Sequence, residues 1–211
     1  MFEIRGIRAP DTALCEAATA LAQRSSEPFL FHHVLRSYVY AEWIGRERKL
    51  DYDRETLYVA TVLHDLGLTA SAPVRERFEV EGADLAARFL LEHGMPERTR
   101  ELVWDAIALH TTAEIPQRKA PEIALCQLGI ACDLRGVPAS VAEAGVVQEA
   151  LRAYPWLEIE EGLLRTLVGL YQKNPAAAAS HAVADACERY LPGFRRFNLC
   201  DVLLANVRRS V

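Results

Sequence analysis

Apolar residues along this 211-residue chain recur at steps of three and four, and almost nowhere do they alternate with a period of two. This periodicity is typical of amphipathic helices, each of which buries one apolar stripe against its neighbours. Residues 2–7 are the possible exception. We therefore predict an all-α fold, a bundle of about eight to ten helices. The expected helices span residues 11–24, 28–48, 54–66, 78–93, 97–110, 121–136, 139–153, 158–172, 175–190 and 198–209.

Residues that start and stop helices separate these segments. Asp11 and Asp53 precede helices and can cap their free N–H groups with a carboxylate. Pro121 occupies the favoured first-turn position of another helix. Gly67 and Gly94 fit the left-handed position that ends a helix. These signals predict where the helices begin and end.

Length, composition and charge narrow the class of protein. The chain suits one domain, residues 1–211, because domains commonly run to about 100–200 residues. Hydrophobic residues make up 51% and charged residues 25%, which is ordinary for a globular protein. The net charge of −5 supplies no positive field for nucleic acid, so we expect no nucleic-acid partner. The five cysteines are scattered and form no C-x-x-C pair, which predicts neither a disulfide framework nor a thiolate zinc site.

Membrane and export signals are also missing from the sequence. The longest nearly uncharged stretches, such as residues 174–184, are shorter than the roughly 18–20 residues that cross a bilayer. Residues 1–10 lack the apolar core of a signal peptide. We therefore expect a soluble cytoplasmic protein without a membrane partner.

The apolar segment VATVLHDLG ends in an adjacent imidazole and carboxylate, His64 and Asp65. Burying such a pair is costly, and binding a divalent metal ion would remove that cost. Two ligands rarely suffice, so others must come from elsewhere in the chain. The sequence offers His33 on the polar edge of a long helix and Asp133 inside the apolar stretch LGIACDLRG. A lone His-Asp pair is equally explained by a hydrogen bond between the two side chains at the end of a helix, without a metal ion.

The order of these residues resembles the HD superfamily of metal-dependent phosphohydrolases, which is named for the adjacent His-Asp pair. Four longer segments look like those of its cyanamide hydratase-like branch: HVLRSYVYAEWIG (33–45), LHDLGLT (63–69), RFEVEGADLAARFL (77–90) and DAIALHT (105–111). The resemblance covers about residues 29–136 and implies an HD-type helical bundle. Residues 137–211 lie outside this resemblance; we expect them to complete or cover the core, to pack a dimer, or both.

The resemblance implies that His33, His64, Asp65 and Asp133 bind one divalent metal ion per chain. A single ion is expected because residues 78–83 lack the histidine that binuclear HD enzymes carry there. Zinc is the first expectation, with iron, manganese, nickel and cobalt as alternatives. Asp133 has a second interpretation, as a capping or salt-bridging acid near Arg135.

Five further residues are candidates for the surroundings of the metal. His110, which ends a predicted helix, is a candidate proton carrier or substrate-binding group. Glu79 is a second candidate for returning a proton to the substrate. Arg36, Tyr40 and Thr69 could orient a bound ligand, although Arg36 could equally pair with a nearby acid.

Three functions follow from this interpretation. The first is a metal-dependent hydro-lyase in which hydroxide formed at the metal adds to a small C≡N compound, as in the conversion of cyanamide to urea. The second is a phosphohydrolase acting on a nucleotide or another phosphate ester; no glycine-rich phosphate cradle is visible. The third is a non-catalytic HD module that binds a ligand. A small-molecule substrate is the expected partner of either enzyme, and a homo-oligomer is possible.

Overall fold

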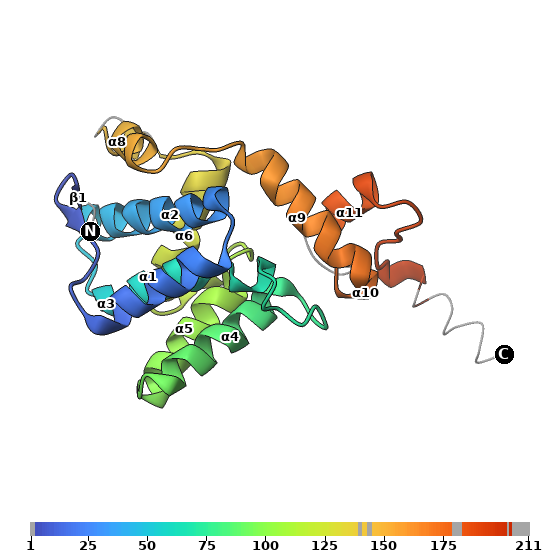
Figure 1. The fold of residues 1–211 in the computed structure, drawn as a ribbon, viewed down its shortest axis with the longest axis horizontal. Coiled ribbons are helices and arrows are strands. Elements are labelled where there is room, and N and C mark those ends of the chain that lie inside the picture. The colour runs from blue at the N-terminus through green and yellow to red at the C-terminus, as the bar shows by residue number, and fades with distance from the viewer. Residues whose placement is uncertain (1–2, 139–140, 143–144, 179–182, 202, 204–211) are drawn as a thin grey trace.

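The structure, a computed structural model, describes residues 3–138, 141–142, 145–178, 183–201 and 203, and it is almost entirely helical (Figure 1). The all-α class predicted from the sequence is confirmed. Parts of the expected helices at 139–153, 175–190 and 198–209 lie outside the described residues. In the described part of the chain, no helix combines the length and apolar character needed to cross a bilayer. The helices are α1 (Ala13–Ser25), α2 (Pro28–Glu47), α3 (Arg54–Leu63), η1 (Leu66–Leu68), α4 (Phe78–Glu92), α5 (Glu97–Leu109), η2 (Pro116–Arg118), α6 (Pro121–Arg135), α8 (Val146–Ala153), α9 (Ile159–Lys173), α10 (Pro175–Ala178) and α11 (Ala184–Tyr190).

A short hairpin lies within residues 2–7 and Arg8, the region that was the possible exception to helical periodicity. Strand β1 (Glu3–Ile4) pairs antiparallel with β2 (Ile7–Arg8). The turn between them places Arg5 and Gly6 at positive φ. The hairpin is too small to alter the helical architecture.

Most helix boundaries follow the local signals. The Asp53 carboxylate accepts a hydrogen bond from the backbone N–H of Thr56 at 2.6 Å, which confirms the predicted cap of α3. Gly94 follows α4 with φ +70°, as predicted. The expected cap at Asp11 is wrong by one residue, because the extended backbone of Thr12 brings its hydroxyl oxygen to the N–H of Cys15.

Gly67 corrects a second expectation. It is not a left-handed helix stop: α3 ends at Leu63, and the chain continues into the 3-10 helix η1 with no positive φ at Gly67. A Cβ atom at Gly67 would overlap the backbone oxygen of Phe78, and one at Gly82 would lie 3.0 Å from the Gly67 nitrogen. Glycine is required here because η1 and α4 approach backbone to backbone. This contact holds the loop that carries His64.

Helices α2 and α6, which carry His33 and Asp133, also approach closely. A Cβ atom at Gly129 of α6 would overlap the backbone oxygen of Ser37 and lie 2.7 Å from the Cβ of Ala41. Ser37 and Ala41 lie on the face of α2 that turns toward α6. Because Gly129 has no side chain, α2 and α6 can approach at this point, and the glycine therefore sets the distance between two helices of the candidate site.

Replacing Gly129 with alanine should destabilise the protein by about 1–3 kcal/mol, because the added methyl group forces α6 away from α2. Gly169→Ala is a matched control, since Gly169 also lies within a helix but faces open space. That change should stabilise the protein by up to about 1 kcal/mol through helix propensity. Urea unfolding of both variants gives the two free energies of unfolding; equal effects would contradict the close packing.

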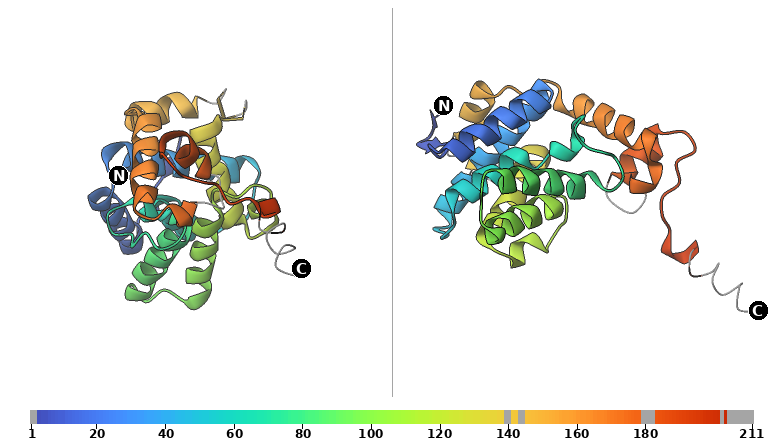
Figure 2. Two further views of the ribbon diagram at one scale, coloured as in Figure 1. Left: turned by 90° about the vertical axis from the view of Figure 1, so that its right-hand side faces the viewer. Right: turned by 60° about the horizontal axis from the view of Figure 1, so that its bottom comes forward.

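Two hydrophobic clusters organise the interior. The larger one is formed mainly by α1 to α6. The smaller one joins α9–α11 to the start of α2 and to η1, and it includes Phe29, Leu68, Phe78 and Tyr171. Figures 1 and 2 show α9 and α11 at one end of the helical bundle. The C-terminal helices thus cover the end of the bundle where α2, η1 and α4 meet.

Candidate metal centre

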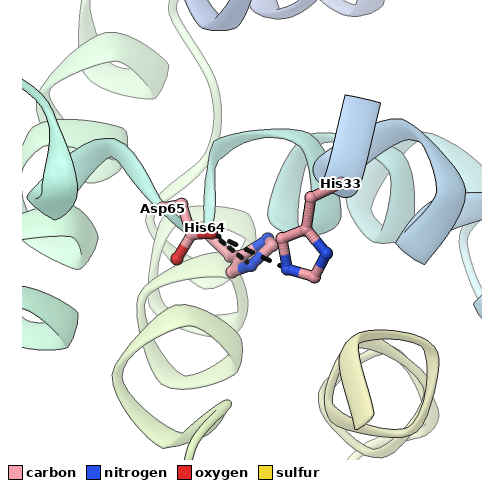
Figure 3. A group of neighbouring side chains, drawn as sticks. All are labelled: His33, His64 and Asp65. Carbon is pink, nitrogen blue, oxygen red and sulfur yellow. Dashed lines mark ion pairs between the residues drawn. The ribbon is translucent and has the colours of Figure 1, made fainter. Parts of the chain in front are cut away.

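Three side chains from two parts of the fold meet at this end of the bundle. His33 comes from α2, while His64 and Asp65 lie between α3 and η1 (Figure 3). Their exposed fractions are 1%, 1% and 5%, and one ligand atom from each lies within 4.8 Å of the others. The expected grouping of these three residues is thereby observed in space.

The Asp65 carboxylate is the centre of the group. Its Oδ2 lies 3.1 Å from Nε2 of His64 and 3.7 Å from Nε2 of His33. Its Oδ1 lies 3.9 Å from Nε2 of His110, which caps the end of α5. Three imidazole rings from three helices therefore turn the same nitrogen toward one carboxylate.

The opposite ring nitrogens explain why Nε2 faces inward. Nδ1 of His64 lies 2.7 Å from the Thr61 carbonyl oxygen, and Nδ1 of His110 lies 2.6 Å from that of Ile107. A carbonyl oxygen can only accept a hydrogen bond, so each Nδ1 carries the proton and donates it. In a neutral ring this leaves a lone pair on Nε2, directed toward Asp65.

The electrostatics of the group favour a bound cation. Burial alone would raise the pKa of Asp65, but the adjacent His64, with His33 and His110 nearby, holds that pKa well below its usual range. Burial lowers the pKa of His64, and the attraction of Asp65 outweighs this and raises it. Burial and the neighbouring His64 lower the pKa of His110 to about 4, so this ring is neutral at pH 7.

The donor set fits a divalent ion of the zinc class. Lone pairs on two imidazole nitrogens and a carboxylate oxygen face one another in a buried site, where they repel unless a proton or a cation lies between them. Two histidines and one aspartate are suitable zinc ligands, and three protein ligands leave a position for water or substrate. His33, His64 and Asp65 would hold such an ion.

Asp133 lies at the other nitrogen of the His33 ring. Its Oδ2 is 2.6 Å from Nδ1 of His33, and both carboxylate oxygens accept hydrogen bonds from Arg36, at 2.7 Å from Nε and 2.8 Å from Nη2. These donors hold the pKa of Asp133 below its usual range against the effect of burial. Asp133 does not belong to the group formed by His33, His64 and Asp65. Arg36 pairs with an acid, Asp133, which is one of the alternatives left open by the sequence.

A cavity of about 150 Å³ opens beside the metal group. His110 lines it, together with Thr111 and Gln127. Glu79 is buried behind this wall and accepts a hydrogen bond from the Thr111 hydroxyl at 2.6 Å. Arg36, Tyr40 and Thr69 are buried outside the described lining, and the Thr69 hydroxyl donates to the Leu66 carbonyl at 2.7 Å.

The structure adds residues that the sequence analysis did not select. Thr111 directly follows His110 in DAIALHT, so its position was a usable signal. Gln127 is a buried amide on α6 whose oxygen accepts a hydrogen bond from Gln117. Leu167 of α9 and Val183 complete the apolar wall, so the C-terminal part of the chain covers the cavity, one of the alternatives open from the sequence.

Comparison with known proteins supports the same assignment. The profile of the HD domain family matches residues 30–150, more than half of the chain. No curated protein gives a significant match. HD domains bind divalent metal ions, and the family indicates a metal-dependent hydrolase, with which the His-His-Asp group is compatible. The sequence match and the geometry of the site agree that this chain belongs to the HD domain family.

Proposed function

We propose that this protein is a metal-dependent hydratase that adds water to a small uncharged compound with a C≡N bond, converting cyanamide to urea. The observation that carries the proposal is the small, largely apolar cavity beside the metal group. Leu68, Phe78, Ile130 and Leu167 form much of its wall.

The size of the cavity favours a substrate of few atoms. Its volume is about 150 Å³. Pockets for drug-sized ligands typically measure about 300–1,000 Å³, and one water molecule takes up about 30 Å³ of liquid. Cyanamide fits such a space, whereas a nucleotide is larger than the cavity and would have to extend beyond it.

The charges around the cavity favour a neutral substrate over a phosphate ester. Among the described residues, Arg135 is the one arginine or lysine in its lining. Arg36 is already paired with Asp133, and Lys119 with Asp105. Besides the metal ion, a phosphoryl group would meet only this one exposed cation among the described lining residues, which is fewer donors than such a group usually receives.

The surrounding side chains have distinct roles in this proposal. His33, His64 and Asp65 would hold one divalent ion per chain, zinc by preference. Such an ion would supply water activated as a nucleophile at neutral pH. His110 holds its Nδ1 proton on a backbone carbonyl, and its neutral Nε2 accepts a proton from the attacking water. The same ring returns that proton to the substrate nitrogen. Glu79 supports the cavity wall through Thr111.

Metal-loaded protein offered cyanamide should form urea, and it should release no phosphate from nucleotides or from an aryl phosphate. Both products can be measured on one preparation. Because a neutral substrate needs no cation, Arg135→Ala should change the rate only a few-fold, about as much as substitution of Arg118, which lies outside the described lining.

The opposite pattern would identify the alternatives. Phosphate release that depends on Arg135, with no urea, would support the phosphohydrolase. Metal binding without turnover of either substrate class would support the non-catalytic module.

A further inference from the structure

We infer that a groove between α1 and α2 is a second ligand site, which binds a small organic cation with an apolar body. Residues of α1, α2 and α3 line this α1–α2 groove together with Tyr154, and its volume is about 400 Å³. None of its described lining residues also lines the cavity beside the metal group. The inference therefore goes beyond the proposed function and does not rest on it.

The packing of α1 explains why the groove exists. Helix α1 packs mainly on α3 and touches α2 at few places. On α2, Phe31 lines the α1–α2 groove, whereas His33 lines the cavity beside the metal group. Two positions on a helix differ by about 200°, so the two sites lie on opposite sides of α2. A ligand in the groove would leave the metal group uncovered.

Hydrogen bonds within the chain fix the floor of the groove. The Thr19 hydroxyl group donates to the Cys15 carbonyl oxygen at 2.7 Å, so its single proton is already used. The Tyr58 hydroxyl group, 2.7 Å from that of Thr19, is therefore the donor of the bond between them. The Tyr58 oxygen keeps lone pairs with which it can accept a hydrogen bond from a ligand.

The wall at Tyr154 is held from α2. The Tyr154 carbonyl oxygen accepts a hydrogen bond from the buried guanidinium of Arg36 at 2.9 Å, and that of Pro155 accepts another at 3.1 Å. The Tyr154 ring lies edge-on to His32, with ring centres 5.7 Å apart. The groove is thus pre-formed, and its volume lies in the range of about 300–1,000 Å³ that is typical of small-molecule sites.

The chemistry of the lining selects the class of ligand. The lining includes three aromatic side chains, Phe31, Tyr58 and Tyr154, and the face of an aromatic ring attracts a cation. Glu16 adds a carboxylate, and Gln23 an amide. Among the described lining residues there is no lysine, arginine or histidine. Such a site suits an ammonium group on an apolar body and disfavours an anion.

Glu16 supplies the charge of this site. Burial raises the pKa of Cys15 to about 11 and the pKa values of Tyr58 and Tyr154 to about 12, so these groups are uncharged at neutral pH. Glu16 is exposed and forms no ion pair with any described residue. An ammonium group in the groove would therefore meet one carboxylate that has no competing cation.

Binding of phenethylammonium to the full-length chain tests the site. At about pH 8 this primary amine keeps its proton. Two molecules of similar size serve for comparison: 2-phenylethanol, which is uncharged, and phenylacetate, which is an anion. In NMR titrations the amine should shift the backbone signals of α1 and of Phe31 and Leu35. It should bind at least about 5-fold more tightly than the alcohol, and phenylacetate should not shift these signals.

Two variants separate the charge from the aromatic wall. Glu16→Gln keeps the shape and should weaken binding of the amine by about 2–5-fold, with no change for the alcohol. Tyr154→Leu keeps apolar bulk and should also weaken it by about 2–5-fold. Together the two changes should cost about 5–25-fold. Glu188→Gln is the matched control, because Glu188 is an exposed helical glutamate outside the groove. This control and His64→Ala should both keep the wild-type affinity.

Three results would overturn the inference. Equal affinity for the amine and the alcohol would show that the groove recognises no charge. Unchanged affinity in the double variant, or shifts confined to η1 and α6, would place the probe elsewhere in the protein. No shift at the highest soluble concentration of the amine would show that the groove is not a site for this class of ligand.

Discussion

His64→Ala and Asp65→Ala should each lose the metal ion almost completely, well beyond the roughly 100-fold weakening expected of residues that only orient ligands. Asp65 is the carboxylate toward which three Nε2 atoms turn, at 3.1–3.9 Å, and His64 is its nearest neighbour. Removing either leaves two ligands, which rarely hold an ion. Metal analysis after exhaustive dialysis measures the loss, and a chelator should abolish the activity of the wild-type protein.

His93→Ala provides the control for this experiment. His93 also follows a helix and is hydrogen-bonded at 2.8 Å to a carbonyl oxygen of that helix, Phe89, but it lies outside the metal group. It should keep the wild-type metal content. If His64→Ala and Asp65→Ala kept it as well, the ion would have to bind elsewhere.

His110→Ala should lower the rate of hydration by about 10²–10⁴-fold while metal content and thermal stability stay near the wild-type values. The ring lines the cavity, and its Nε2 lies 3.9 Å from Asp65, near enough to exchange protons with a water molecule in the site. Its pKa of about 4 keeps Nε2 free to accept a proton at neutral pH.

The rate, the metal content and the melting temperature of His110→Ala should be measured together. Thr111→Val is a near-isosteric companion that removes the hydroxyl group contacting Glu79, and we expect a smaller loss of rate from it. Loss of metal from His110→Ala would make this histidine a ligand. A wild-type rate would remove it from the mechanism.

Local signals predicted most of the helices. Repeats of apolar residues at steps of three and four, the Asp53 cap and the glycine after α4 act within a few residues, and a sequence displays them directly. The meeting of His33 with His64 and Asp65 was predicted through the family resemblance. Helical periodicity alone could place each residue on a face but could not bring the faces together.

The missed features are those set by distant parts of the chain. Gly67 looked like a helix stop. Glycine is required there because the backbone of Phe78, eleven residues further along the chain, leaves no space for a side chain. Leu167 and Val183 look like ordinary apolar residues until α9 and the residue before α11 are seen to line the cavity. The sequence allowed a salt bridge for Asp133 and another for Arg36, but it did not indicate that the two would pair or that Asp133 would also face one side of an imidazole.

The bonds of Arg36 also bear on the order in which the protein matures. They join positions 97 residues apart at Asp133 and 118–119 residues apart at Tyr154 and Pro155. Contacts between such distant positions pay the loop-closure entropy of a long chain. The stretch that matches the family ends at residue 150, so a nascent chain that holds every motif still lacks these two acceptors for the buried guanidinium. The buried guanidinium of Arg36 therefore gains its last two hydrogen-bond acceptors only when the last third of the polypeptide is present.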